Sequence, residues 1–252
     1  MKPAIRAIAE SSPAEPPMFC MLLRKHINSG KIKSIEQIDF ERIIRISVDS
    51  YDELGDYTTK HIYIEIMGRH SNIILVNQEG RIIDSIKRVD DTVSSVREIL
   101  PGGIYELPPR QEKKDLILWD KESDLKLNGF KLDKALIEEI GGISPLTARE
   151  IIYKVFNTTD VLVESVNTNR NAMLKLEIAG LSQRVSDGKF CPCMIEDINT
   201  GKLVEFSAIP ILQYETLAKV REYETMNLLV DEFYHLRDVR ERMRQKTADL
   251  TK

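Results

Sequence analysis

The sequence has few of the residues that support metal or redox chemistry. Cysteine occurs only as Cys20, Cys191 and Cys193, and the 252 residues include four histidines. Three cysteines cannot form a closed disulfide framework, and free thiols are typical of a reducing cytosol. The spacing of cysteine and histidine matches neither a structural zinc site nor a metalloprotease helix. We therefore expect no metal, and we expect Cys191 and Cys193 to be ordinary strand cysteines.

Other functional signals are also missing. The sequence has no glycine-rich loop of the GxxxxGK[ST] or GxGxxG type and no nucleophile in a recognisable catalytic setting. We therefore expect no cofactor and no self-sufficient enzyme. No apolar run approaches the roughly 20 residues that cross a membrane, and the first residues lack the apolar stretch of a signal peptide. The sequence predicts a cytoplasmic protein with no membrane partner.

The charge balance limits how the chain can recruit nucleic acid. The formal net charge is −4, with 30% charged residues. An acidic total does not attract RNA in bulk, so any RNA contact must come from local clustering of basic side chains. The hydrophobic share of 42% is ordinary for a globular chain. The length is that of one large domain or two small ones.

The first part of the chain reads as a short helix followed by strands. Three prolines exclude a helix or a central strand at 9–17. The apolar residues that follow recur at helical spacing up to Gly30. Alternation with a period of two then predicts four strands with local connections, an antiparallel meander, at 42–48, 61–67, 72–76 and 81–86. Prolines and glycines between 101 and 109 close this β-rich unit.

The second part is mainly helical. Two helices within 133–156 flank Gly141-Gly142, and a third covers 171–182. Strand character returns at 190–214, which we expect to rejoin the first sheet. A charged helix from Ala218 carries an imperfect heptad seam that suggests a coiled-coil arm. We thus predict an α+β fold with a β-rich unit, a helical unit, returning strands and a coiled-coil start, at 1–110, 111–185, 186–217 and 218–252.

Two polar places near the strands are candidate contacts to an anionic partner. The adjacent pair Glu41 and Arg42 precedes a strand, and on a strand the two would face opposite sides. An exposed Arg42 suits bidentate binding of phosphate. Arg69 and His70 lie in a loop that Gly68 allows to bend tightly. On the residue pattern alone, the plainer alternatives are a solvated charge pair and a solvated turn.

A third candidate place is the start of a helix. Ser144 is a good N-cap, Pro145 suits the first helical position, and Arg149 follows in the next turn. Backbone N–H groups at a helix N-terminus form a natural phosphate site. Ser144 and Arg149 are therefore candidate phosphate contacts, and a simple helical packing unit is the alternative.

Several runs along nearly the whole chain resemble the NFACT, or fibronectin-binding-protein-A-like, family and its bacterial RqcH branch. These runs are PPMFCMLLRKH, IEIMGRHSNIILV, DSIKRV, LPGGIYELPP, GGISPLTARE and LVDEFYHLRDVRERMRQKTADL. The resemblance implies a β-rich sandwich like the N-terminal domain of formamidopyrimidine-DNA glycosylases, with a helix-hairpin-helix-like unit. It does not imply glycosylase activity, because the N-terminal proline and the zinc finger of those enzymes are missing.

The resemblance also implies a function in ribosome quality control. Such proteins bind the obstructed large ribosomal subunit that holds a peptidyl-tRNA nascent chain. They recruit alanyl-tRNA and support template-free alanine tailing. The family's tRNA-related motif is an Asp-Arg pair, which matches Glu41 and Arg42 here, with one methylene added to the acid. Arg69 and His70 are implied as further tRNA contacts.

Two expectations concern the limits of the chain and the rival functions. The family begins with a helix and strands ahead of the segment that matches Arg6 onward, so we expect an unpaired sheet edge here. We also expect the coiled coil to continue past residue 252. The rival reading is a surface adhesin that binds fibronectin, for which an export signal would be expected. A DNA-repair remnant is the third reading.

Overall fold

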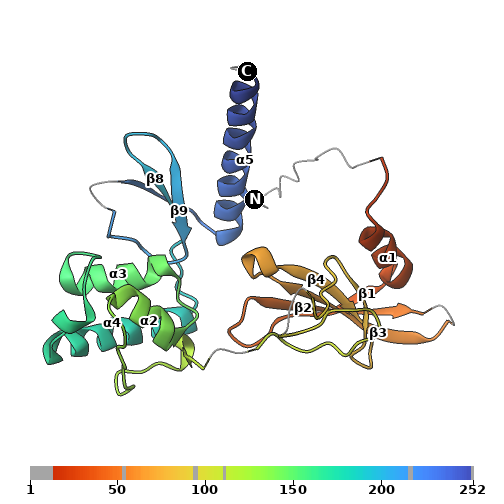
Figure 1. The fold of residues 1–252 in the computed structure, drawn as a ribbon, viewed down its shortest axis with the longest axis horizontal. Coiled ribbons are helices and arrows are strands. Elements are labelled where there is room, and N and C mark those ends of the chain that lie inside the picture. Colours follow the sequence, from red (N-terminus) through yellow and green to blue (C-terminus); the bar gives the residue numbers. More distant parts are fainter. Residues whose placement is uncertain (1–13, 53–54, 93–95, 110–111, 215–217, 251–252) are drawn as a thin grey trace. The chain divides into compact units, whose positions relative to one another are not determined.

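The structure is a computed structural model that describes residues 14–52, 55–92, 96–109, 112–214 and 218–250, with the side chains of 246–250 left aside. The chain divides into two compact units, 1–110 and 111–252. Figure 1 shows a sheet with one helix in the first unit, and helices, a small sheet and a long helix in the second. The break falls at the proline-rich run around residue 110.

The first unit is a five-stranded antiparallel meander. The strands lie in sequence order in the sheet: β1 (Lys31–Gln37), β2 (Ile43–Tyr51), β3 (Tyr57–Glu65), β4 (Asn72–Val76) and β5 (Ile82–Ser85). The four predicted strands are confirmed, and β1 is additional. β1 lies at the edge, is exposed at nearly every position, and shifts register between Ile32 and Ser34. It therefore lacks the alternation that marks a half-buried strand.

The two faces of this sheet are covered differently. On one face Ile74, Val76 and Ile82 pack with Ile99, under a segment that follows β5. Helix α1 (Met18–Ile27) lies against the other face, where the Ser50 hydroxyl donates to the His26 carbonyl at 2.9 Å. The described residues of this unit therefore form one sheet covered by a helix and a loop, and not the two packed sheets expected for a sandwich.

A buried lysine ties α1 to the sheet. Lys60 is 4% exposed, and its ammonium donates to the hydroxyls of Ser50 at 3.1 Å and Thr58 at 3.0 Å. Because Ser50 in turn binds the carbonyl of His26, the charge lies near the C-terminal end of α1. That end carries the negative pole of the helix dipole, which favours a cation.

The partly buried ring of His61 is a group of the first unit whose protonation depends on folding. Ser47 Oγ lies 3.0 Å from His61 Nδ1. Burial, together with the charge of Arg45, lowers the pKa of His61 below its ordinary value of 6.5. The folded state thus favours the neutral ring, whereas the unfolded chain takes up a proton as the pH falls through 6.5. Stability from this site is present above that pH and is lost as the pH falls through the lowered pKa.

We predict that His61→Gln will reduce the loss of stability of the first unit between about pH 7.5 and about pH 5.5. Amide hydrogen exchange of peptides from β2 and β3 measures this unit separately from the rest of the chain. An equal acid-induced loss of protection in the parent and the variant would contradict the assignment.

The helical part of the second unit follows the prediction closely. It contains α2 (Leu132–Glu139), α3 (Pro145–Phe156) and α4 (Thr168–Ser186), with the short helices η2 (Leu116–Leu118) and η3 (Val163–Ser165). Gly142 bends the α2–α3 connection with φ of +86°. A parallel pair that was not predicted, β6 (Lys114–Asp115) and β7 (Ile140–Gly141), also lies here. The core is aliphatic, with fully buried residues such as Leu132, Leu136, Leu146, Ile152, Leu174 and Ile178.

The later strands do not rejoin the first sheet. β8 (Cys193–Asp197) and β9 (Leu203–Ser207) pair with β10 (Ala218–Glu222) in a sheet of their own, in the order β10-β8-β9. The expected return was wrong because residues 218–222, predicted as helix, form the strand that closes the free edge of β8. Cys193 is the first residue of β8 and is buried, and Cys191 lies two residues before it.

The long helix α5 (Met226–Leu250) begins after β10, later than predicted. Its first apolar residues pack on the small sheet: Leu229 is fully buried and Phe233 is 7% exposed. Their neighbours are Met194, Leu203 and Phe206. The first half of the heptad seam is therefore buried by the unit's own strands. Met243, further along, is 63% exposed, and a coiled coil in that half stays a prediction.

Glu150 on α3 binds the backbone of the segment that connects β9 and β10. This α3 side chain is 1% exposed. Its carboxylate accepts from the backbone N–H groups of Leu212 at 2.9 Å and Gln213 at 3.1 Å, and from the Gln213 amide at 3.2 Å. Both backbone donors would lose their acceptor if this carboxylate were removed.

We predict that Glu150→Ala will lower the free energy of unfolding of the second unit by about 3 kcal/mol, since each buried donor left unpaired costs about 1–3 kcal/mol. Urea unfolding followed by the fluorescence of Trp119, the only tryptophan, reports on this unit. The matched control is Glu138→Ala on α2, where the side chain is exposed. Equal midpoints for the two variants would contradict the role of Glu150.

Candidate nucleic-acid interface

One end of the five-stranded sheet gathers three loops. Ile43 at the start of β2 pairs with Glu65 at the end of β3, and Glu65 pairs with Asn72 at the start of β4. The turn before β2 and the loop after β3 therefore leave the sheet at the same end, and Ile66 N donates to the Arg42 carbonyl at 2.9 Å. The chain after β5 joins them there, because Ile86 N donates to the Ile73 carbonyl at 2.9 Å.

These loops bring basic side chains together. We call this place the basic end of the sheet and define it by Arg42, Arg69, His70, Lys87 and Arg88, all of them exposed. All five come from the three segments that leave the sheet at this end, although they span 47 positions of the sequence, from Arg42 to Arg88 counted inclusively. The predicted residues Arg42, Arg69 and His70 thus belong to one place in the fold.

Glu41 and Arg42 lie in the turn before β2 and not on the strand itself. The expectation that they face opposite sides of a strand was therefore wrong. The turn is held by Gln37, whose side-chain amide donates to the Glu41 carbonyl at 2.8 Å. Among the described residues, neither the Arg42 guanidinium nor the Glu41 carboxylate has a side-chain partner. Glu41 therefore does not orient Arg42 in this structure, and Arg42 has all its donors free.

Arg69 and His70 lie in the short helix η1 (Gly68–His70), which follows a bend at Gly68 with φ of +59°. The Arg69 Nε donates to His70 Nε2 at 2.9 Å, so the ring accepts a hydrogen bond and holds the guanidinium. Lys87 reaches the same turn, because its ammonium donates to the Arg69 carbonyl at 3.2 Å. These contacts bring the Lys87 ammonium to the turn that carries Arg69 and His70.

Two acids beside the basic end are buried and paired. Asp84 is 7% exposed and binds Arg88 through two hydrogen bonds, of 2.9 and 2.7 Å. The hydrogen bond from Arg88 holds the pKa of Asp84 below its usual value. Glu65 is 3% exposed and pairs with Arg97 at 2.6 Å. The acids that remain on the surface of this region include Asp39 and Glu41, in the turn that carries Arg42.

The Glu65 pair belongs to a larger cluster. The Tyr105 hydroxyl donates to Glu65 at 2.9 Å, and the Tyr105 ring stacks on Tyr63 with centroids 3.9 Å apart. Arg97 lies over the Tyr105 ring at 5.2 Å. Burial and the Glu65 charge raise the pKa of Tyr105 far above its ordinary value, so the hydroxyl stays a donor. Through Glu65, this cluster holds the segment after β5 against the end of the sheet where Ile43, Glu65 and Asn72 are paired.

We predict that Glu65→Ala will destabilise the first unit by about 3–5 kcal/mol, because it leaves the Arg97 guanidinium, whose side chain is 11% exposed, without its carboxylate partner. Hydrogen exchange across β3 and β4 measures the loss. Glu79→Ala, in the exposed turn at the opposite end of the sheet, is the matched control. Protection as high in Glu65→Ala as in that control would show that the pair does not stabilise the sheet.

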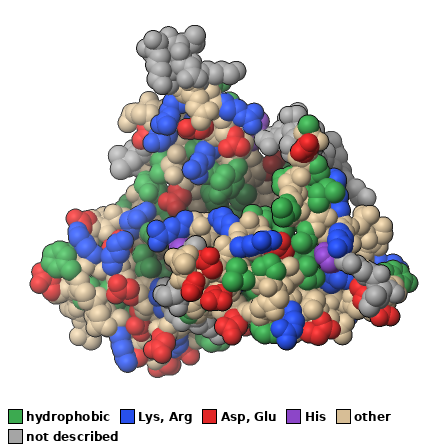
Figure 2. All heavy atoms as spheres, turned by 45° about the vertical axis from the view of Figure 1, so that its right-hand side comes forward, with side chains coloured by type: hydrophobic (Ala, Val, Ile, Leu, Met, Phe, Trp, Pro, Cys, Tyr) green, Lys and Arg blue, Asp and Glu red, His purple; other side chains and the backbone are tan. Residues whose placement is uncertain are grey.

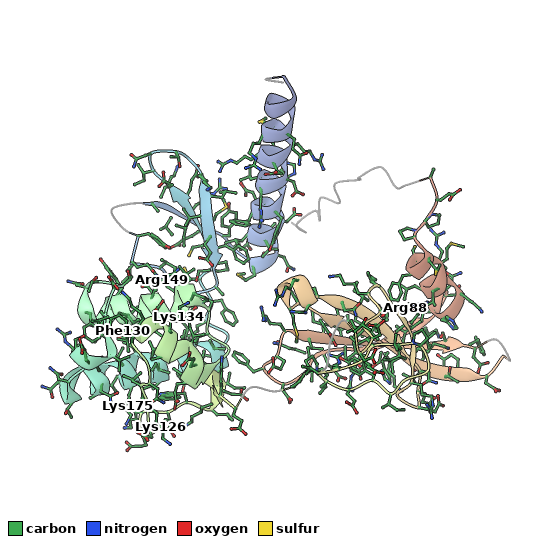
Figure 3. All side chains as sticks on the ribbon, in the orientation of Figure 1. Arg88, Lys126, Phe130, Lys134, Arg149 and Lys175 are labelled. Atoms are coloured by element: carbon green, nitrogen blue, oxygen red, sulfur yellow. The ribbon has the colours of Figure 1, made fainter. Side chains whose placement is uncertain are left out.

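The other predicted contacts, Ser144 and Arg149, belong to the second unit. Ser144 caps α3: its hydroxyl accepts from Thr147 N at 3.1 Å and lies 3.0 Å from the Thr147 hydroxyl. The predicted N-cap is confirmed, and this capping bond occupies the side chain. Arg149, half-buried on α3 and labelled in Figure 3, has no side-chain partner among the described residues. Ser144 and Arg149 thus lie in a different unit of the chain from the basic end.

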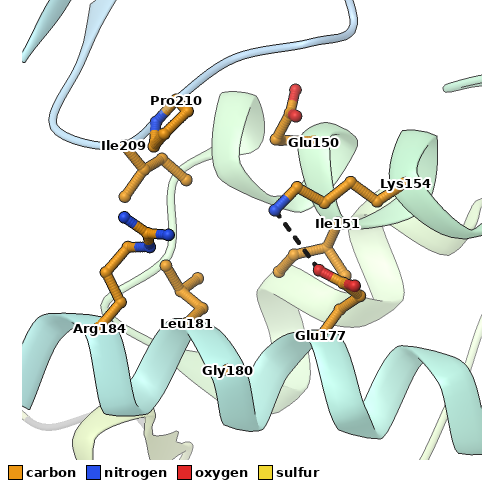
Figure 4. A pocket seen from close by; sticks show the side chains of 9 residues that line it. All are labelled: Glu150, Ile151, Lys154, Glu177, Gly180, Leu181, Arg184, Ile209 and Pro210. Atoms are coloured by element: carbon orange, nitrogen blue, oxygen red, sulfur yellow. Dashed lines mark ion pairs between the residues drawn. The ribbon is translucent and has the colours of Figure 1, made fainter. Parts of the chain in front are cut away.

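The helical part of the second unit contains a pocket. It has a volume of about 180 Å³ and lies between α3, α4 and residues 209–210 (Figure 4), where Lys154 pairs with Glu177 at 3.4 Å. None of the six predicted contact residues lines it. Within the described ranges, no cluster of three or more metal-ligating side chains occurs. None of the helices described is both long and apolar enough to cross a membrane.

The surface charge is mixed. On the face shown in Figure 2, Lys and Arg side chains alternate with Asp and Glu, and no single basic field covers it. This agrees with the net charge of −4. An RNA contact on this chain therefore depends on a local cluster such as the basic end of the sheet.

Comparison with known proteins identifies the family. The profile described as NFACT N-terminal and middle domains matches residues 3–252. The chain belongs to the NFACT family. The protein named Rqc2 homolog RqcH of Bacillus subtilis is 35% identical over 250 residues, which cover 98% of this chain and 41% of that protein. Its namesake in Streptococcus pneumoniae is 28% identical over 246 residues, covering 95% and 38%. The chain thus spans about two fifths of these relatives.

Two solved structures share the fold. The crystal structure of the fibrinogen binding protein from Staphylococcus aureus matches with a TM-score of 0.69 and 30% identity, covering 87% of this chain and 76% of that one. The N-terminal part of the fibronectin/fibrinogen-binding protein from Streptococcus suis matches with a TM-score of 0.62 and 26% identity, covering 89% and 75%. The NFACT chain described here therefore shares its architecture with proteins named for binding fibrinogen or fibronectin.

Proposed function

We propose that this NFACT chain is the tRNA-binding part of a ribosome quality-control factor that acts in the cytoplasm. The observation that carries the proposal is the basic end of the sheet. There Arg42 is exposed with free donors, the Lys87 ammonium binds the carbonyl of Arg69, and the nearby Glu65 and Asp84 are buried and paired. The relatives named Rqc2 homolog RqcH support the wider role.

In this proposal the chain binds and positions RNA and does not catalyse a reaction by itself. Guanidinium groups bind phosphate oxygens through paired N–H donors, while a lysine ammonium acts as a compact point charge. The RNA is alanyl-tRNA, brought to an obstructed large subunit that still holds a peptidyl-tRNA nascent chain. Holding the tRNA there supports template-free addition of alanine. Arg42, Arg69 and His70 supply the contacts, and Glu41 is the neighbouring acceptor for ribose or base N–H and O–H groups.

We predict that Arg42→Ala will weaken binding of alanyl-tRNA several-fold. It should also reduce the dependence of log affinity on log salt by about 0.7–0.9, the value for one lost phosphate contact. Fluorescence anisotropy with labelled tRNA over a series of salt concentrations measures both quantities. The matched control is Lys31→Ala, an exposed cation of β1 at the opposite end of the sheet.

The proposal predicts that Arg42→Ala and Lys31→Ala differ in their affinity for tRNA and in its salt dependence. If Arg42→Ala keeps the affinity and the salt slope of the parent, or if Lys31→Ala lowers them equally, the contact is not specific to the basic end. Circular dichroism of both variants checks that the fold is retained, which is expected because the Arg42 side chain has no partner within the described structure.

The names of the two solved neighbours favour a second candidate, an adhesin that binds fibrinogen or fibronectin. The two readings differ in where the full protein is found and in what it binds. Recovery with large ribosomal subunits, with tRNA in the bound fraction, supports the first. Recovery at the cell surface, with saturable binding to immobilised fibronectin and none to tRNA, would favour the second.

A further inference from the structure

A buried asparagine links two of the loops at the basic end. Asn72 is 5% exposed and lies in the last row of the sheet, opposite Glu65. Its side-chain amide donates to the Lys87 carbonyl at 2.8 Å. Its side-chain oxygen accepts from Lys87 N at 3.0 Å and from Ile73 N at 2.9 Å. All its polar atoms are therefore engaged with backbone.

The pair of bonds between Asn72 and Lys87 acts like one more rung of the sheet. In an antiparallel ladder, two facing residues exchange an N–H and a carbonyl. Here the Asn72 amide takes the place of the facing backbone after β5 has ended at Ser85. The Ser85 hydroxyl adds a bond to the Lys87 carbonyl at 2.9 Å. The backbone of Lys87 is thus fixed relative to β4.

Fixing this backbone directs the lysine side chain to the neighbouring loop. The Lys87 ammonium donates to the Arg69 carbonyl at 3.2 Å, and Lys87 is exposed. An ammonium has three donors, and this one has a single protein partner among the described residues, a neutral carbonyl. No carboxylate neutralises it, in contrast to Arg88 beside it, which is paired with Asp84.

We propose that Lys87 is an RNA-backbone contact, and that Asn72 is a positioning residue that holds Lys87 beside the Arg69–His70 turn. This inference rests on the proposed function and adds a residue to the same site. The two N–H donors of Lys87 that no described residue uses are available to the phosphate oxygens of such a partner. Arg69, held by His70, offers a second cation from the turn that the Lys87 ammonium reaches.

The decisive experiment is a double-mutant cycle on tRNA binding by the whole chain. Lys87→Ala should weaken binding several-fold and reduce the salt slope by about 0.7–0.9, while Lys87→Arg should keep most of the affinity. Asn72→Ala should weaken binding in the parent. In the Lys87→Ala background it should have little further effect, because the residue it positions is already gone.

Three outcomes separate the claims. Parent-like binding by Lys87→Ala, with Arg42→Ala impaired, would overturn this inference and leave the proposed function standing. If neither variant is impaired, the proposed function fails as well. An equal loss from Asn72→Ala in both backgrounds would show that Asn72 acts on the fold and not through Lys87. The Lys87 variants keep every backbone bond, so they test the contact even if Asn72→Ala unfolds.

Discussion

The candidate interface depends on one row of the first sheet, in which Ile43, Glu65 and Asn72 lie side by side. All three are at most 5% exposed. Glu65 holds Arg97 and Tyr105, and Asn72 holds the backbone of Lys87. These contacts hold the row and the segment after β5 together. The three loops that begin at the row therefore have fixed starting points, and their basic side chains gather at the same end of the sheet.

This arrangement explains how an acidic chain can present a local positive surface. Burying a carboxylate with a guanidinium removes negative charge from the surface and gives the neighbouring loops a rigid base. Glu65 and Asp84 are both used in this way. The cations that remain free act over a short range, because salt screens exposed charges beyond roughly 10 Å. RNA contact through this site is therefore a matter of close geometry and not of overall charge.

Sequence reasoning found the elements with a clear period and missed those without one. Strands β2 to β5 and helices α2 to α4 have regular apolar patterns because each buries one face. The edge strand β1 was missed because it is exposed at almost every position and so shows no alternation. Strand β10 was missed because its residues were assigned to the charged helix that follows it. The expectation that β8 and β9 return to the first sheet was wrong because β10, the strand that pairs with β8, had not been recognised. The likeness to formamidopyrimidine-DNA glycosylases stays a prediction.

The candidate site could be derived from the sequence in part. Arg42, Arg69 and His70 were proposed as contacts from local motifs, and the sheet register shows that their loops leave the sheet at the same end. Lys87 and Asn72 were missed because their bonds join residues 15 positions apart, and the Glu65–Arg97 pair joins residues 32 apart. Such partners leave no local pattern. The run DSIKRV contains Lys87, but only the fold shows that its ammonium reaches the Arg69 turn.

The most direct test of the central claim is to map where tRNA touches the chain. Ultraviolet cross-linking of bound alanyl-tRNA, followed by mass spectrometry of the cross-linked peptides, reports the contact site without any substitution. The account predicts cross-links within 38–42, 66–71 and 86–88, the three loops of the basic end. Cross-links confined to the opposite end of the sheet, such as the turn at 77–80, or to the second unit alone, would contradict it.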